Sequence, residues 1–89
     1  MEVINVDTHE RVGVIPNLQG VHGVIAVPKS GRGITTNGRS NTASIFDLKT
    51  LVKIVELPTG KNPDALMYDS FSNRVFVFNH SDVTATAID

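Results

Sequence analysis

The chain has 89 residues, a formal net charge of −1 and no cysteine. This length allows one small domain or part of a larger one. The absence of cysteine excludes disulfides and cysteine-based metal or nucleophile sites, and the near-neutral charge disfavours nucleic-acid binding. No apolar run approaches the ~20 residues of a membrane span, and the first ten residues lack the basic and apolar regions of a signal peptide.

The strand-like segments are short, rich in β-branched residues and bounded by Gly, Pro, Asn, Asp or Ser. In chain order, the segments that we expect to be strands are residues 3–6, 11–15, 22–27, 33–37, 42–47, 51–57, 64–69, 74–79 and 84–89. No segment carries apolar residues at helical spacing. The sequence therefore predicts an all-β fold.

The second half of the chain repeats the first at an interval of about 42 residues. From residue 16 onward the alignment needs no gap, and its identities fall at turns and strand ends: Pro16 with Pro58, Ser30 with Ser72, Arg32 with Arg74, Asn37 with Asn79, and Asp47 with Asp89. Before residue 16 we expect an interval shorter by two, which aligns Asp7 with Asp47. Four short antiparallel strands per repeat of this length are typical of a β-propeller blade.

We therefore predict β-propeller blades of four antiparallel strands, about two and a quarter in number. Residues 1–15 would form the last two strands of one blade, 16–57 a full blade, and 58–89 the first three strands of the next. Because propellers close with about four to eight blades, this is an incomplete ring. Either several copies associate, with residues 11–15 supplying the fourth strand to a neighbouring copy, or the remaining blades belong to a longer chain.

Three stretches resemble the YVTN family of β-propeller repeat proteins: "GITTNGRSNTASIFDLKT", "VHGVIAV" and "LPTGKNPDAL". The resemblance covers nearly the whole chain, with departures at Ile34, where the family has tyrosine, and at Val21, where it has proline. It implies a surface-layer-like propeller and an exported or periplasmic location. Related propellers carry haem in nitrite reductases or form the large subunit of amine dehydrogenases.

Two side chains are candidates for ligand binding. His22 and Asp64 occupy the same position in consecutive repeats, at the start of the strand that lies nearest a propeller's central channel. A ring of such side chains at the channel mouth could bind a metal or a polar ligand, because His and Asp are competent ligand types. The alternative is that His22 only bonds a neighbouring loop.

Five polar residues are interpreted as structural turn residues because Asn and Asp side chains bond turn backbone and tolerate left-handed conformations. They are Asn37, Asn79, Asp7, Asp47 and Asp89.

No enzyme motif is present: "PTGKNPD" lacks the P-loop spacing, and nothing resembles a nucleophile elbow. We therefore predict a non-enzymatic module for binding or scaffolding, with no catalytic residues and no cofactor. The alternatives are a fragment of a propeller enzyme, either a lactonase-like hydrolase or the propeller part of a haem or quinone oxidoreductase, and a structural repeat of a surface array. An incomplete ring exposes strand edges and apolar faces, which predicts self-association or low stability of a single copy.

Overall fold

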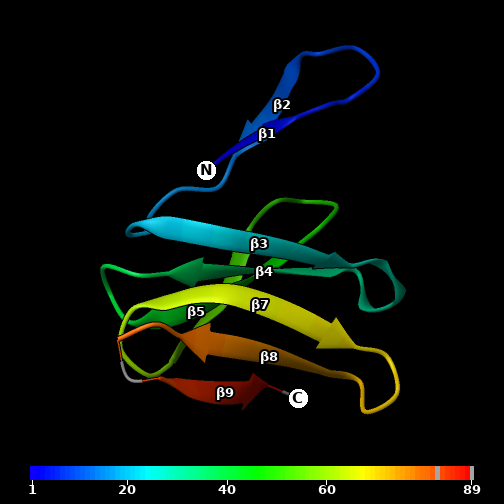
Figure 1. Ribbon diagram of the computed structural model, residues 1–89. Helices are drawn as coiled ribbons and strands as arrows, with labels where there is room; N and C mark the ends of the chain where they lie inside the picture. Colours follow the sequence, from blue (N-terminus) through cyan, green and yellow to red (C-terminus); the bar gives the residue numbers. More distant parts are fainter. Residues whose placement is uncertain (82, 89) are drawn as a thin grey trace.

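The computed structural model describes residues 1–81 and 83–88, which form three antiparallel sheets (Figure 1). The N-terminal hairpin contains β1 (Glu2–Ile4) and β2 (Arg11–Val14). The central sheet contains β3 (Val21–Val27), β4 (Arg32–Asn37), β5 (Thr42–Asp47) and β6 (Lys53–Pro58), with a short 3-10 turn, η1 (Pro28–Ser30), after β3. The C-terminal sheet contains β7 (Pro63–Asp69), β8 (Arg74–Asn79) and β9 (Thr84–Ile88).

Within each sheet, strands that are consecutive in the sequence pair with each other, in the orders β1-β2, β3-β4-β5-β6 and β7-β8-β9. The predicted all-β, antiparallel character is therefore confirmed. The three sheets do not close into a ring within the described residues, so their assignment to propeller blades stays a prediction. None of the described residues belongs to a helix long and apolar enough to cross a membrane.

The backbone conformation recurs at the 42-residue interval even where the residue type differs. Eight of the nine described residues with positive φ fall into four pairs separated by 42 residues: His9 with Leu51, Gly20 with Asn62, Gly31 with Asn73, and Asn41 with Val83. The turn after β4 docks on the segment before β3 through Gly38 N–H to Gly20 C=O, and the turn after β8 does the same through His80 N–H to Asn62 C=O. Positive φ is costly for any residue with a side chain, so the matching positions indicate that the same turns recur.

The interval stays at 42 residues in the N-terminal hairpin, which corrects the predicted alignment of Asp7 with Asp47. Asn5 accepts the backbone N–H groups of Asp7 and Thr8 through Oδ1, at 2.8 and 3.1 Å. Asp47 accepts those of Lys49 and Thr50 in the same way, both at 2.8 Å. Asp7 lies in the turn, but Asn5 is the residue whose side chain organises it.

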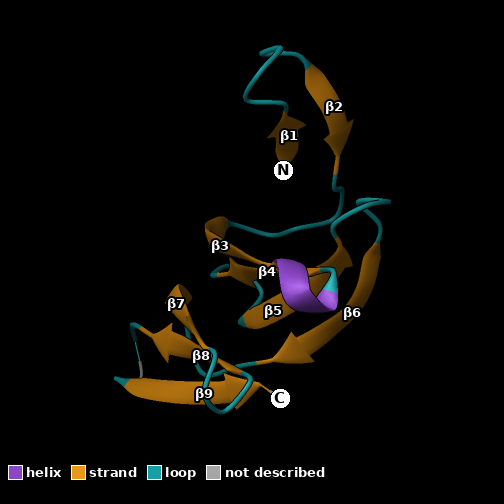
Figure 2. Cartoon of the chain, turned by 90° about the vertical axis from the view of Figure 1, so that its right-hand side faces the viewer, coloured by secondary structure: helices purple, strands orange, loops and turns teal. Residues whose placement is uncertain are grey.

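The central and C-terminal sheets pack face to face, mainly through β3, β4 and β7 (Figure 2). Alternate residues along each strand point to opposite faces, so one face of each sheet builds the core. Five buried residues form this core: Val27, Ile34, Ala43, Val75 and Val77. Ile25, Ile45, Leu66, Tyr68 and Ile88 are partly buried against them. The core therefore lies between two sheets and stabilises their mutual orientation.

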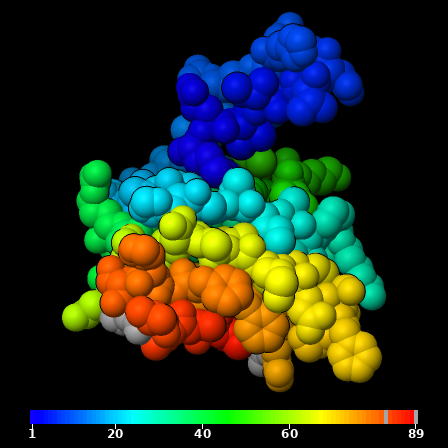
Figure 3. Space-filling model, in the orientation of Figure 1, coloured from blue at the N-terminus to red at the C-terminus, as the bar shows by residue number. Residues whose placement is uncertain are grey.

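The N-terminal hairpin projects from the rest of the molecule (Figure 3). β1 and β2 contact each other far more than they contact any other strand. Apolar side chains on the hairpin are left in solvent, with Ile4 57% and Val12 58% exposed. Ile15, which follows β2, is fully buried and exchanges backbone hydrogen bonds with Met1.

Candidate functional site

The structure brings His22 and Asp64 together at the junction between the two larger sheets. Each is the second residue of an inner strand, β3 or β7, and the His22 Nδ1 to Asp64 Oδ1 distance is 3.8 Å. Both side chains are about half exposed, at 48% and 56%. A pair this open to solvent contributes little to stability, but it remains accessible to a partner or ligand.

A buried threonine holds the two inner strands in this position. The hydroxyl of Thr36 donates to the carbonyl oxygen of Asp64 at 2.6 Å and accepts the N–H of Gly23 at 2.9 Å. A Cβ on Gly23 would lie only 2.9 Å from that same Asp64 oxygen, so the close approach of the strands requires glycine there. Thr36 thus joins β3, β4 and β7 in one polar bridge, a role that nothing in the sequence signalled.

Gly38 leaves room for the imidazole of His22. A Cβ at this position would lie 2.5 Å from His22 Cδ2 and 2.7 Å from Asn62 Oδ1. The equivalent residue in the next repeat is His80, which lines an open hollow of about 590 Å³ together with Asp64 and Phe78. No group of three or more His, Asp or Glu side chains within the described residues is arranged to hold a metal ion. His22 and Asp64 are therefore two potential ligand side chains without a third beside them among the described residues.

One face of the C-terminal sheet points away from the central sheet and is not covered by any described element. Along β8, Val75, Val77 and Asn79 are buried toward the central sheet, so Phe76 and Phe78 point the other way. Pairing places the side chains of Met67 and Ala87 beside Phe76, and that of Ala85 beside Phe78. We call this set the far face: Met67, Phe76, Phe78, Ala85 and Ala87. All five are apolar, and both Met67, at 50%, and Phe78, at 44%, are well exposed.

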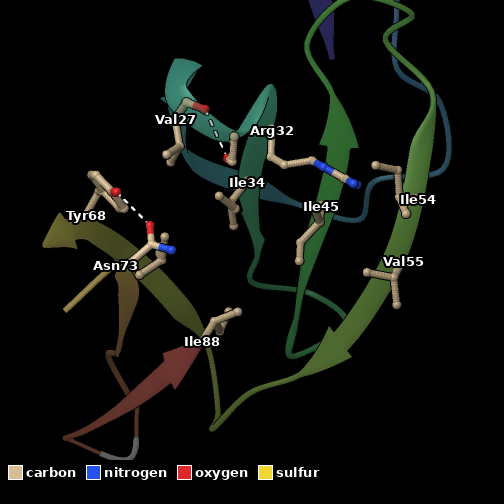
Figure 4. Close-up of a pocket in the computed structure, with 11 residues that line it drawn as sticks. Val27, Arg32, Ile34, Ile45, Ile54, Val55, Tyr68, Asn73 and Ile88 are labelled. Carbon is tan, nitrogen blue, oxygen red and sulfur yellow. Dashed lines mark hydrogen bonds between the residues drawn. The ribbon is translucent and has the colours of Figure 1, made fainter. Parts of the chain in front are cut away.

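A second cavity, of about 260 Å³, opens between the outer strands of the two sheets (Figure 4). Ile45 and Val55, on β5 and β6, line one wall, and Ile88 on β9 projects toward them from the other side (Figure 4). The Tyr68 hydroxyl is anchored to Asn73 Oδ1 at 2.8 Å near the rim. The cavity is a wedge in which the two sheets diverge toward their outer edges.

Asn37 and Asn79 are turn residues with buried side chains that bind the next strand. Nδ2 of Asn37 donates to the hydroxyls of Thr42 and Ser44, and Nδ2 of Asn79 donates to those of Thr84 and Thr86. The two differ at the carbonyl oxygen. Thr35 donates its hydroxyl to Asn37 Oδ1 at 3.1 Å. The equivalent position beside Asn79 is Val77, and Asn79 Oδ1 has no hydrogen-bond partner among the described residues.

Two partly exposed carboxyl groups, those of Asp47 and Asp69, accept hydrogen bonds within hairpin turns. Backbone N–H groups of Thr50 and Lys49 lower the pKa of Asp47 below its ordinary value, because hydrogen bonds favour the ionised form. The Ser72 hydroxyl and then the Phe71 N–H lower the pKa of Asp69 in the β7–β8 turn. Asp69 was not among the turn residues predicted from the sequence. Asp89, which was, lies outside the described residues.

Comparison with models of protein families and with curated proteins finds no match. The resemblance to YVTN repeats therefore rests on the short motifs alone.

Proposed function

We propose that the chain is a β-propeller repeat module that works by binding or scaffolding, without catalysis, and that its C-terminal sheet is built to receive another apolar sheet. The backbone repeat supports this proposal, since equivalent turns recur through three consecutive sheets. The four-stranded antiparallel meander of the central sheet is followed by the three-stranded meander of the C-terminal sheet, which packs on its face as neighbouring propeller blades do.

The observation that carries the proposal is the equivalence of the far face to an interface that the chain already makes. Subtracting the 42-residue interval from Met67, Phe76, Ala85 and Ala87 leads to Ile25, Ile34, Ala43 and Ile45. These four central-sheet residues all pack in the core against the C-terminal sheet. The far face thus repeats, one unit later, the apolar pattern by which one sheet binds the next.

The far face differs from its counterpart in one respect that bears on the partner. At the position of Thr36, which makes the polar bridge to Asp64, the later repeat has Phe78. A phenyl ring cannot provide the bridge, so the interaction at this corner is apolar. The proposed partner is therefore a sheet face with space for a phenyl ring, and its binding is driven by burial of apolar surface.

Replacement of Phe78 by serine tests the proposal, with Phe71→Ser as the matched control. Phe71 is 98% exposed in the β7–β8 turn, away from the far face. Full burial of a phenylalanine contributes about 1.5–3 kcal/mol, and association would bury only the 44% of Phe78 that is exposed, so Phe78→Ser should weaken association by about three- to tenfold. The assay is the weight-average mass by light scattering over a concentration series. Equal association of the two variants and the unchanged chain would contradict the proposal.

A further inference from the structure

We infer that copies of this chain join through their sheet edges: β2 of one copy pairs with β9 of another and becomes the outermost strand of its C-terminal sheet. This inference rests on the proposed function and adds the partner and the contact. The partner is a second copy, and the contact is a continuous antiparallel sheet.

The two edges are complementary because of their places in the repeat. In the central sheet, β5 pairs with β4 on one side and with β6 on the other. β9 is the equivalent of β5, but among the described residues it pairs only with β8. β2 is the equivalent of β6, since both follow the same turn, with His9 and Leu51 at positive φ. β2 is thus the strand that corresponds to the pairing partner of β5, and β9 is the strand that corresponds to β5 itself. β2 lies in the projecting hairpin (Figure 1).

The register follows from the pairing of β5 with β6, where Ala43 faces Leu57, Ser44 faces Glu56 and Ile45 faces Val55. Moving each β5 residue forward and each β6 residue back by 42 places Ala85 opposite Ile15, Thr86 opposite Val14, and Ala87 opposite Gly13 of the other copy. No like charges oppose each other in this register, and Gly13 and the two alanines leave space between the strands.

In this arrangement β9 takes the position that β1 holds in a single copy, so β1 must be displaced. The β1–β2 pairing is short: it joins three residue pairs, is interrupted by an irregularity after Val3, and is extended by the hydrogen bonds between Met1 and Ile15, which the new pairing would replace with Ala85 opposite Ile15. Its one ion pair, Arg11 with Glu2 at 3.2 Å, is well exposed on both sides and therefore weak. Exchange of a marginal hairpin for a longer edge pairing is the usual basis of strand swapping.

The same contact covers exposed apolar side chains beside the wedge cavity. When β2 of the other copy is added at the free edge of β9, it lies opposite β6 of the central sheet. On β6, Ile54 is 48% and Val55 39% exposed at the margin of the cavity. Val12 and Val14 of the incoming β2 are themselves 58% and 47% exposed in the single copy. Burial of both sets in one contact gives the pairing a hydrophobic driving force beyond its backbone hydrogen bonds.

Engineered cysteines test the register directly, because the natural chain has none. We expect a chain with both Val14→Cys and Thr86→Cys to form disulfide-linked dimers and larger species on mild oxidation, visible on a non-reducing gel. The control carries Val14→Cys and Val24→Cys, since Val24 is exposed on β3 at the opposite edge of its sheet. Equal cross-linking of the two double variants would overturn the inference.

Proline substitutions provide a second measurement. Ile15 exchanges backbone hydrogen bonds with Met1, so the N–H of Gly13, two residues earlier, points to the same side, where β9 of the other copy would lie. Gly13→Pro removes this donor and should reduce the scattering mass toward that of one copy, whereas Val6→Pro, in the exposed turn before β2, should not. Oligomers that survive Gly13→Pro and show no specific cross-link would overturn this inference and leave the proposed function standing. A chain that stays at the mass of one copy at every concentration would overturn both.

Discussion

Because Asn79 Oδ1 lacks a hydrogen-bond partner among the described residues, Val77→Thr should destabilise the protein far less than such a change usually does. Replacement of a buried valine by threonine normally destabilises a protein, because the hydroxyl loses its hydrogen bonds with water. At Val77, which is fully buried, the new hydroxyl would instead stand where Thr35 stands in the preceding repeat. There it can donate to Asn79 Oδ1, which accepts no hydrogen bond from the part of the chain that the structure describes.

The change in the free energy of unfolding that we expect for Val77→Thr follows from comparing the two repeats. An unpaired buried polar group costs about 1–3 kcal/mol, and a hydrogen bond between neutral groups contributes about 1 kcal/mol net. Val77→Thr adds one buried polar group and satisfies two, so its free energy of unfolding should lie within about 1 kcal/mol of the unchanged chain. Val75→Thr is the matched control: Val75 is 5% exposed on the same strand and face. It should lose the full ~1–3 kcal/mol.

The assay is urea unfolding followed by far-ultraviolet circular dichroism, at a concentration where the scattering mass is that of one copy. The reverse change, Thr35→Val, should orphan Asn37 Oδ1 and destabilise the protein by about 1–3 kcal/mol. If Val77→Thr destabilises the protein as much as Val75→Thr does, the new hydroxyl does not donate to Asn79 Oδ1, and this prediction is wrong.

Two further outcomes follow from the turns. Val83→Asn should raise the free energy of unfolding by about 1 kcal/mol, because Val83 has φ 54° and is 91% exposed, while its equivalent is Asn41. Val24→Asn, at an exposed position without positive φ, should bring no gain in the same urea titration. The pKa of Asp47 is lowered in the folded protein from its ordinary value of 3.8, so its contribution to stability is present above that pH and is lost as the pH falls through the folded pKa. Asp47→Asn should keep the turn, as Asn5 does, and reduce the stability difference between about pH 5 and about pH 2; an unchanged difference would contradict this assignment.

The strands and their order were predictable because β-branched residues alternate with turn residues along the whole chain. The "RVFVFN" segment (residues 74–79) is apolar on both faces, and the structure buries one of them, since Val75 and Val77 pack against the central sheet. The alignment near the N-terminus was wrong because it matched one aspartate with another. The left-handed backbone at His9 and Leu51 fixes the equivalence instead, and a leucine at the second position gives no sign of that conformation.

The polar contacts between sheets were not predictable in the same way. Thr36 and Asp64 are 28 residues apart, and the contact uses a backbone carbonyl, which leaves no trace in the sequence. His22 and Asp64 were expected at equivalent positions in separate repeats. Their approach to 3.8 Å depends on the packing of β3 against β7. The unpartnered oxygen of Asn79 likewise arises from a single difference between repeats, Thr35 against Val77.

The central claim is that the far face and the sheet edges of this chain bind another sheet. The most direct test is the light-scattering mass of the unchanged chain across a concentration series, compared with the 9.6 kDa of one copy. We predict a mass that rises above this value with concentration, and that is lower in Phe78→Ser than in Phe71→Ser at the same concentration. A monodisperse species of 9.6 kDa at every concentration would contradict it.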